Sequence, residues 1–278
     1  MKKINRRSFL AAAGLTAAAL ALTACGGSAS STASSTASSA ASSEAASTSA
    51  AAELTTVEAG KLTMATNAAF PPYEMTTDAG EFEGIDIDTA KAIAEKLGLE
   101  LQIDDMDFDA ALLSVQQGKA DIVMAGVTVT DERKAVMDFS DSYATGIQSI
   151  IVPEGSDITS PDDLAGKKIG TQRGTTGYIY CSDDFGDENV VAYDDGLTAV
   201  QALNNGQVDA VVIDNAPAQE FIAANPGLKI LDTSYAEEDY AIGMAKGSSL
   251  EDAVNAALEE LKADGTLQAI VDKYITAE

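Results

Sequence analysis

One helix-turn-strand pattern occurs twice in this chain and limits the folds that it can adopt. Shifting the sequence by 88 residues aligns Gly118 with Gly206, Asp121 with Asp209, and the apolar run 122–125 with 210–213. Each copy predicts a helix, a tight glycine turn, an acidic residue and a strand buried on both faces. Two lobes built alike would produce this repeat, although helix-turn-strand units of any α/β protein also resemble one another.

Further strand and helix patterns extend this interpretation. Residues 61–65 predict a first strand, and the apolar spacing within 90–97 predicts a helix that Asp86 or Asp88 caps and Gly98 ends. Short apolar strands that alternate with helical patterns favour an α/β fold with mainly parallel sheets. Ligand groups then belong beyond the carboxyl ends of the strands.

The N-terminal region predicts export and anchoring. Residues 1–24 contain basic, apolar and small residues in the order of a secretory signal peptide. Cys25 follows in a sequence that resembles a bacterial lipobox, which implies cleavage before Cys25 and lipid attachment to its thiol. Residues 25–53 add a Ser, Ala and Thr linker that is too polar to fold. Both the general and the twin-arginine export routes stay open.

Charge and composition exclude several classes of function. The chain carries a net charge of −27, and removing residues 1–24 makes the mature charge more negative. Such a surface repels nucleic acid and anionic membranes. The absence of histidine excludes Ser-His-Asp and Cys-His catalysis and histidine metal sites, so we expect no metal and no cofactor. Beyond Leu22 no apolar run approaches the roughly 18 residues of a membrane helix, which leaves the lipid as the membrane contact.

Arg133 is the first candidate for ligand binding. A helix that begins near Asp131 would place this cation in its first turn, where the helix dipole disfavours it by about 0.3–1 kcal/mol. A guanidinium binds a carboxylate through two parallel hydrogen bonds, and Thr128 could donate its hydroxyl to the same anion. The alternative is a surface arginine paired with Asp131 or Glu132.

The second half of the chain supplies complementary groups. Thr175 and Thr176 follow Gly174 at a predicted helix start, where free amides attract an anion, unless the motif is a plain capped turn. Asp214 ends an apolar strand, so its carboxylate needs a cationic partner or else caps the next helix. Arg133 for a carboxylate and Asp214 for an ammonium together indicate an α-amino acid.

Seven motifs run in order from about Lys61 to Tyr274. They are Phe70-Pro-Pro-Tyr-Glu, Gly84-Ile-Asp-Ile-Asp, Ala125-Gly-Val-Thr-Val-Thr-Asp-Glu-Arg, Phe139-Ser-Asp-Ser-Tyr, Gln172-Arg-Gly-Thr-Thr, Asp209-Ala-Val-Val-Ile-Asp and Asp264-Gly-Thr with Lys273-Tyr. Their series resembles the polar amino-acid substrate-binding lipoproteins of ABC importers, solute-binding protein family 3. The resemblance covers nearly all of the chain that is expected to fold.

This resemblance implies a two-lobed periplasmic-binding-protein type II fold with two hinge crossings. Residues 54–146 and 241–278 would form lobe 1, and residues 147–240 would form lobe 2. The protein would be a monomer that captures a free amino acid by hinge closure and delivers it to a permease and ATPase on separate chains. It would lie at the extracytoplasmic face of the cell membrane, in a periplasm or on a cell surface.

The resemblance also assigns roles to individual residues. It implies that Arg133 binds the α-carboxylate with help from Thr128 and the Thr176 amide, while Asp214 binds the α-ammonium. The remaining expected ligand-binding residues are Asn67, Phe70, Phe108, Gly126 and Thr175. Phe70 and Phe108 would enclose the ligand side chain, although either alone would be a core residue.

Selectivity and activity leave alternatives open. Some basic-amino-acid binders carry an acid where this chain has Asn67, which favours a neutral polar ligand such as glutamine or cystine. Arg173 could face the cleft or solvent. An enzyme like cyclohexadienyl dehydratase, with Glu74, Asp214 or a tyrosine as acid or base, is the other class, and a ligand-sensing module is a third. The amino-acid recognition pair favours binding without catalysis.

Overall fold

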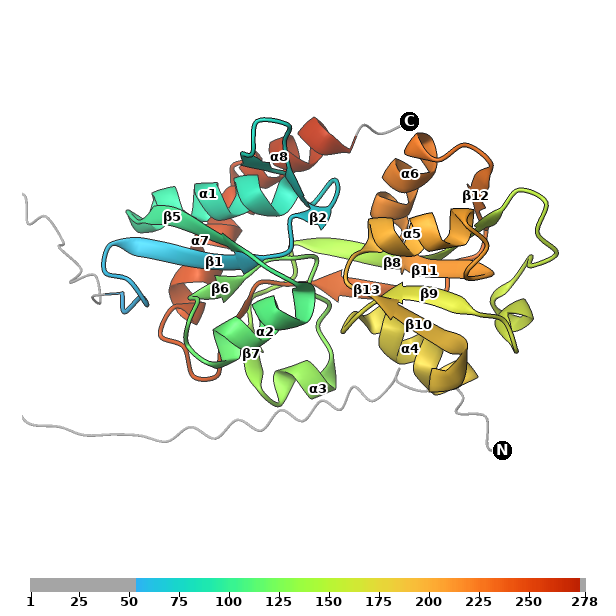
Figure 1. The fold of residues 1–278 in the computed structure, drawn as a ribbon. Coiled ribbons are helices and arrows are strands. Elements are labelled where there is room, and N and C mark those ends of the chain that lie inside the picture. The colour runs from blue at the N-terminus through green and yellow to red at the C-terminus, as the bar shows by residue number, and fades with distance from the viewer. Residues whose placement is uncertain (1–53, 276–278) are drawn as a thin grey trace, which may run out of the picture. The chain divides into compact units, whose positions relative to one another are not determined.

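The computed structural model describes residues 54–275 (Figure 1). The predicted signal peptide 1–24, the lipidation of Cys25 and the linker to residue 53 lie outside the described residues. The strands are β1 (Lys61–Thr66), β2 (Ala69–Phe70), β3 (Glu74–Thr76), β4 (Phe82–Glu83), β5 (Glu100–Asp105), β6 (Ile122–Val123), β7 (Met137–Phe139), β8 (Ala144–Pro153), β9 (Ile169–Gln172), β10 (Val190–Tyr193), β11 (Ala210–Asp214), β12 (Leu228–Ile230), β13 (Ala236–Tyr240) and β14 (Gly243–Ala245). The α-helices are α1 (Ile85–Leu97), α2 (Phe108–Gln116), α3 (Asp131–Lys134), α4 (Thr176–Phe185), α5 (Gly196–Asn204), α6 (Asn215–Ala224), α7 (Glu251–Ala263) and α8 (Thr266–Tyr274).

Two large sheets organise these elements. The first has the strand order β5-β1-β6-β14-β7, and the second has the order β10-β9-β11-β8-β12 with β13 also paired to β8. Helices α1, α7 and α8 pack together beside the first sheet, whereas α4, α5 and α6 contact strands of the second (Figure 1). A small β2-β3-β4 sheet precedes α1. The predicted α/β fold with two sheet-and-helix halves is confirmed.

Both sheets are mixed, and the prediction of mainly parallel sheets is wrong in this detail. β1 pairs parallel with β5 and β6, and β9 pairs parallel with β10 and β11. β14 and β8 run antiparallel to all their partners. These two strands lie on the segments that pass between the sheets, so they enter each sheet from the opposite direction. Apolar runs reveal that a strand is buried but not its direction.

The two sheets are joined by two crossing segments that run side by side. The chain passes from β7 to β8 and later returns from β13 to β14. The Tyr143 amide donates to the Tyr240 carbonyl at 3.0 Å, and β13 pairs along its length with β8. The two crossing segments therefore contact each other near Tyr143 and Tyr240.

The internal repeat is present in three dimensions. Helices α2 and α5 are each followed by a glycine with positive φ, at 65° for Gly118 and 67° for Gly206. Beyond each glycine an aspartate leads into a buried central strand. The Asp121 carboxylate accepts the Thr63 amide at 2.8 Å, and the Asp209 carboxylate accepts the Lys168 amide at 2.8 Å. The repeated aspartates thus attach corresponding strands in the two sheets.

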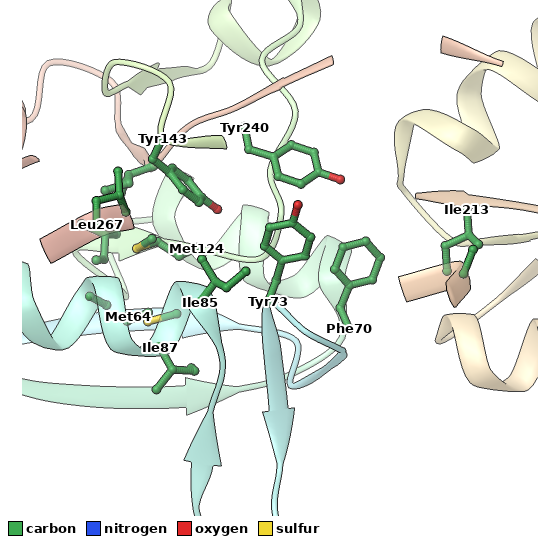
Figure 2. Close-up of a cluster of buried hydrophobic side chains, with 14 of the residues drawn as sticks. Met64, Phe70, Tyr73, Ile85, Ile87, Met124, Tyr143, Ile213, Tyr240 and Leu267 are labelled. Atoms are coloured by element: carbon green, nitrogen blue, oxygen red, sulfur yellow. The ribbon is translucent and has the colours of Figure 1, made fainter. Parts of the chain in front are cut away.

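Aromatic side chains fill the core next to the crossings (Figure 2). The rings of Phe70 and Tyr73 are stacked with centroids 5.9 Å apart, and the Tyr73 and Tyr240 rings meet edge to face at 5.3 Å. Tyr240 is fully buried. Edge-to-face and offset contacts of this kind add to the stabilisation that burial gives. Cys181 is buried in the core of the second sheet.

The start of α1 differs from the prediction of an aspartate cap. The residue before the helix is Gly84, at φ 133°, and no side chain caps the first turn. A Cβ at Gly84 would lie 2.1 Å from the Tyr73 carbonyl oxygen, so only glycine fits there. Asp86 is instead buried, and its carboxylate accepts the Gly126 amide at 3.0 Å and the Tyr143 hydroxyl at 2.8 Å. The predicted end of the helix at Gly98 is confirmed.

Candidate functional site

One pocket collects all nine residues that the sequence predicts for ligand binding. Its lining residues are Asn67, Phe70, Glu74, Phe108, Ala125, Gly126, Thr128, Arg133, Gln172, Thr175, Thr176 and Asp214. Asn67 directly follows β1, while Gln172 and Asp214 end β9 and β11. Ala125 and Gly126 lie in the loop after β6. The pocket therefore lies between the two sheets, at the carboxyl ends of their strands, where α/β folds usually bind ligands. Glu74, Ala125 and Gln172 were not among the predicted ligand-binding residues.

Arg133 lies inside this pocket and is 8% exposed. It belongs to the short helix α3, whose first turn is capped by the Thr130 side chain. Its guanidinium donates to the carbonyls of Thr128 at 2.7 Å and Gly174 at 3.1 Å, and it lies 5.4 Å from the Phe108 ring centroid. None of the ion pairs between described residues includes Arg133, so the surface pairing with Asp131 or Glu132 is wrong. Burial lowers the pKa of this guanidinium, which therefore gains from an anionic partner.

The start of α4 faces the same pocket. Thr175 occupies the N-cap position, and its hydroxyl oxygen accepts the Tyr178 amide at 3.3 Å. Thr176 is the first residue of the helix and is buried in the pocket wall. Amides of a first helical turn have no partner within the helix and point toward an approaching anion. The predicted helix start after Gly174 is confirmed.

Asp214 supplies the negative charge of the pocket. It occupies the N-cap position of α6, but its side chain makes no capping hydrogen bond, so the capping alternative is wrong. Oδ2 accepts Nε2 of Gln148 at 2.7 Å, and the buried carboxylate also interacts with the Tyr240 hydroxyl. Burial raises the pKa of Asp214 to about 7, and the charge of Glu238 acts in the same direction. This carboxylate gains from a cationic partner.

Thr128 lies in the pocket but does not offer its hydroxyl proton there. That hydroxyl donates to Oε2 of Glu238 at 3.1 Å. A hydroxyl has one proton, so the prediction that it donates to the same anion as Arg133 is wrong for this structure. Glu238 was missed because an acidic residue in a charged segment such as 237–239 carries no signal of burial.

A second acidic pair lies at the inner end of the pocket. Glu74 is fully buried at the start of β3, and neither of its carboxyl oxygens has a hydrogen-bond partner among the described residues. Burial, followed by the charge of Asp86, raises the pKa of Glu74 well above its usual range. Burial also raises the pKa of Asp86 to about 6. Burial therefore favours the neutral form of the Glu74 carboxyl over its ionised form.

Asn67 joins the two walls of the pocket. Its amide nitrogen donates to the Met106 carbonyl at 2.9 Å, and its oxygen accepts Nε2 of Gln172 at 2.9 Å. Gln172 lies at the end of β9 in the second sheet, so this bond links one sheet to the other. Neutral amides therefore occupy the position where an acid would select a basic side chain.

Arg173 points away from the pocket. Its guanidinium donates to the Ala192 carbonyl at 3.3 Å and lies 3.5 Å from a carboxylate oxygen of Asp194. Half of its side chain is exposed to solvent. Arg133 is consequently the arginine that lines the pocket.

The described residues add two further observations on the class of protein. Between residues 54 and 275 no group of three or more cysteine and acidic side chains is arranged to hold a metal ion. Over the same range no helix is long and apolar enough to cross a membrane.

Comparisons with known proteins agree with this architecture. Residues 62–277 match the family model of the bacterial extracellular solute-binding proteins, family 3. The L-cystine-binding protein TcyJ of Escherichia coli (strain K12) is 32% identical over 80% of this chain and 85% of its own length. An ancestral arginine-binding protein is 43% identical in structures bound to glutamine and to arginine. Both cover 78% of this chain, with 99% and 98% of their own chains and TM-scores of 0.75 and 0.74.

Proposed function

Because this chain belongs to the bacterial extracellular solute-binding proteins of family 3, we propose that it captures a free α-amino acid for an ABC importer. One observation carries the proposal. Arg133 and Asp214 are buried in the walls of one pocket with opposite charges, and neither forms an ion pair with a described residue. An α-amino acid brings the carboxylate and the ammonium that compensate both. Members of this family bind solutes, and the chain is a binding protein rather than an enzyme.

The two ends of the ligand backbone take separate positions. Its carboxylate binds the Arg133 guanidinium and the first-turn amides of α4 at Thr176. Its ammonium binds Oδ1 of Asp214 and the backbone at Gly126. Gly126 has φ 55°, and a Cβ there would lie 2.9 Å from the Phe70 ring, so the loop fits only as glycine. The ligand side chain lies between Phe70 and Phe108.

Asn67, Glu74 and Gln172 form a polar part of the pocket, and this part favours glutamine among the possible ligands. Asn67 and Gln172 are neutral amides, and burial raises the pKa of Glu74, which favours its neutral form. A protonated carboxyl both donates and accepts, which matches the side-chain amide of glutamine. Arginine is the second candidate, since the two unpartnered oxygens of Glu74 would bind a guanidinium once the carboxyl ionises. The similar ancestral protein has been crystallised with each of these two amino acids.

A thermal-shift screen tests the proposal. The protein is unfolded and refolded to remove co-purified ligand and is then heated with each of the twenty amino acids and with cystine. A ligand at 100 times its dissociation constant should raise the free energy of unfolding by about 2.7 kcal/mol. The proposal fails if none of these compounds shifts the melting temperature. Binding of cystine alone would replace glutamine as the ligand and leave the function intact.

Glu74→Gln separates the two candidate side chains. The substitution preserves a neutral donor and acceptor, so glutamine affinity should change less than threefold. Arginine affinity should fall at least tenfold, since the variant cannot ionise to match the guanidinium. If the wild-type protein prefers arginine and the variant retains that affinity, Glu74 does not contact the ligand side chain.

Capture then depends on hinge closure. The groups for the carboxylate and the ammonium are divided between the two sheets, so a bound amino acid favours the closed arrangement of the two lobes, 54–146 with 241–278 and 147–240. A permease recognises the closed form, and an ATPase on another chain supplies energy. A lipid on Cys25 with the linker 26–53 would keep the monomeric binding domain close to that permease and raise its effective concentration. Cys25→Ser should release the protein from the membrane fraction into the medium or the periplasm.

A further inference from the structure

Glu238 is a buried carboxylate next to the pocket, and it accepts hydrogen bonds from residues in both walls of the pocket. Glu238 is on β13, one of the two crossing segments, and is 7% exposed. Its Oε2 accepts the hydroxyl of Thr128 at 3.1 Å and the hydroxyl of Thr176 at 2.8 Å. Thr128 follows a strand of the first sheet, and Thr176 begins a helix packed on the second. Glu238 therefore bridges the two halves of the site.

The proton count of these hydroxyls determines what they offer a ligand. Each threonine hydroxyl has one proton and two lone pairs, and Glu238 receives both protons. Only lone pairs then remain to face the pocket. The two hydroxyl oxygens are 3.5 Å apart, so they form a pair of acceptors rather than donors. A pair of acceptors suits an ammonium and repels a carboxylate.

Gln148 donates hydrogen bonds to both Asp214 and Glu238. Its Nε2 donates to Oδ2 of Asp214 at 2.7 Å and to Oε2 of Glu238 at 3.1 Å. One nitrogen thus holds two buried acidic side chains, and neither forms an ion pair with a described residue. Two adjacent buried acids without a cation are costly unless a cation joins them. The charge of Arg133 acts on both acids, and a ligand ammonium next to Asp214 would lower their cost further.

We infer that Glu238 is a positioning residue for the ammonium site: it orients the Thr128 and Thr176 hydroxyls so that their lone pairs face the ligand ammonium. The inference rests on the proposed amino-acid binding and deepens it. Glu238 contacts no ligand itself. It sets the polarity of two hydroxyls that do, and it adds a second negative charge behind Asp214.

The inference predicts a loss of discrimination in Glu238→Gln. The glutamine side chain can donate its own protons to the two hydroxyls, which turns the hydroxyl protons toward the pocket and removes the second charge. Calorimetry compares glutamine with 4-carbamoylbutanoate, the same molecule without its α-amino group. The variant should lower the preference for glutamine over this analogue about tenfold compared with the wild-type protein. Glu237→Gln makes the same chemical change on the exposed face of the same strand and should leave the preference unchanged.

The possible outcomes separate the role of Glu238 from the proposed function. A preference in Glu238→Gln within twofold of the wild-type value overturns the inference, as does an equal loss of affinity for both compounds. Should Glu238→Gln fail to fold, Thr128→Val removes one acceptor at constant shape, and an unchanged preference there overturns the inference as well. If the wild-type protein binds arginine instead, arginine and 5-guanidinopentanoate replace the pair. Failure of the wild-type protein to bind any amino acid would refute the proposed function rather than the role of Glu238.

Discussion

At the scale of single residues, the site depends on buried charged groups that have no ion-pair partner among the described residues. Arg133 donates to two backbone carbonyls and Asp214 accepts from Gln148, but neither forms an ion pair with a described residue. Groups of this kind are expensive in a folded protein and are retained where a ligand compensates them. The pocket is therefore built to be completed by a molecule with both charges.

Arg133→Lys should weaken binding of every amino acid that the protein recognises. Lysine offers a single ammonium in place of two parallel donors and also gives up contacts with the Thr128 and Gly174 carbonyls. Losing one charge-assisted hydrogen bond costs about 1.5–3 kcal/mol, which corresponds to a 10- to 100-fold rise in the dissociation constant. Arg173→Lys is the matched control, because Arg173 is half-exposed and turned away. Equal affinity in Arg133→Lys and the wild-type protein would refute the role of Arg133.

The raised pKa of Asp214 predicts opposite effects of pH on affinity and on unliganded stability. Asp214 must be ionised to bind an ammonium, and its pKa in the unliganded protein is about 7. Affinity should therefore fall between pH 8 and pH 5, approaching tenfold for each unit below 7. A carboxyl with a raised pKa stabilises the folded state below its unfolded pKa and loses that contribution as pH rises through the folded value. Asp214, with Asp86 and Glu74, should thus make the unliganded protein more stable near pH 5 than at pH 8.

Calorimetry and thermal melting across this pH range measure both effects. Asp214→Asn cannot titrate, so its affinity should be low at every pH and its stability should vary less with pH than that of the wild-type protein. A wild-type affinity that is constant from pH 5 to pH 8 would contradict an ionised Asp214 as the partner of the ammonium.

At the scale of elements, the sequence predicts those features that depend on the chemistry of neighbouring residues, such as helix ends and caps. Gly98 ends α1, Thr130 caps α3 and Thr175 caps α4 because each position needs a particular backbone shape or a short side-chain acceptor. The aligned Asp121 and Asp209 mark the same turn in both halves. Strand direction in β8 and β14 depends on the path of the whole chain, which no local pattern records.

The repeated aspartates should differ in how much they stabilise the fold. The Asp121 carboxylate accepts two backbone amides, from Val57 at 2.7 Å and from the buried Thr63 at 2.8 Å. Asp209 accepts the exposed Lys168 amide. Asp121→Ala should lower the free energy of unfolding by about 2–4 kcal/mol. Asp209→Ala should lower it by about 1 kcal/mol or less, because water can replace the hydrogen bond from the exposed Lys168 amide. Urea unfolding measures both, and equal losses would show that the two turns do not differ in burial.

The same physical limits separate the site residues that the sequence predicts from those that it does not. Arg133, Asp214 and Thr176 stand at strand ends or helix starts, where a charge or a free amide has few structural uses. Glu74 and Glu238 lie in short strands, and their burial follows from contacts with residues far away in the chain. The sequence does not reveal their unpartnered oxygens, because these depend on how the two sheets pack.

At the scale of the whole molecule, two mixed sheets joined by two crossings place the halves of one site on separate bodies. Asn67 and Gln172 already join the two walls, as do Thr128 and Thr176 through Glu238. An amino acid that spans from Arg133 to Asp214 adds contacts to both walls, so its binding stabilises closure. Under the proposed function, binding and hinge closure would form one equilibrium.

Isothermal titration calorimetry of the refolded protein tests the central claim most directly. Titration with glutamine, arginine, histidine and cystine should give saturable heat with at least one of them, at one molecule per chain, and a much lower affinity for its analogue lacking the α-amino group. Absence of heat with all four would contradict an amino-acid site. Equal affinity for an amino acid and its des-amino analogue would contradict the pairing of Asp214 with an ammonium.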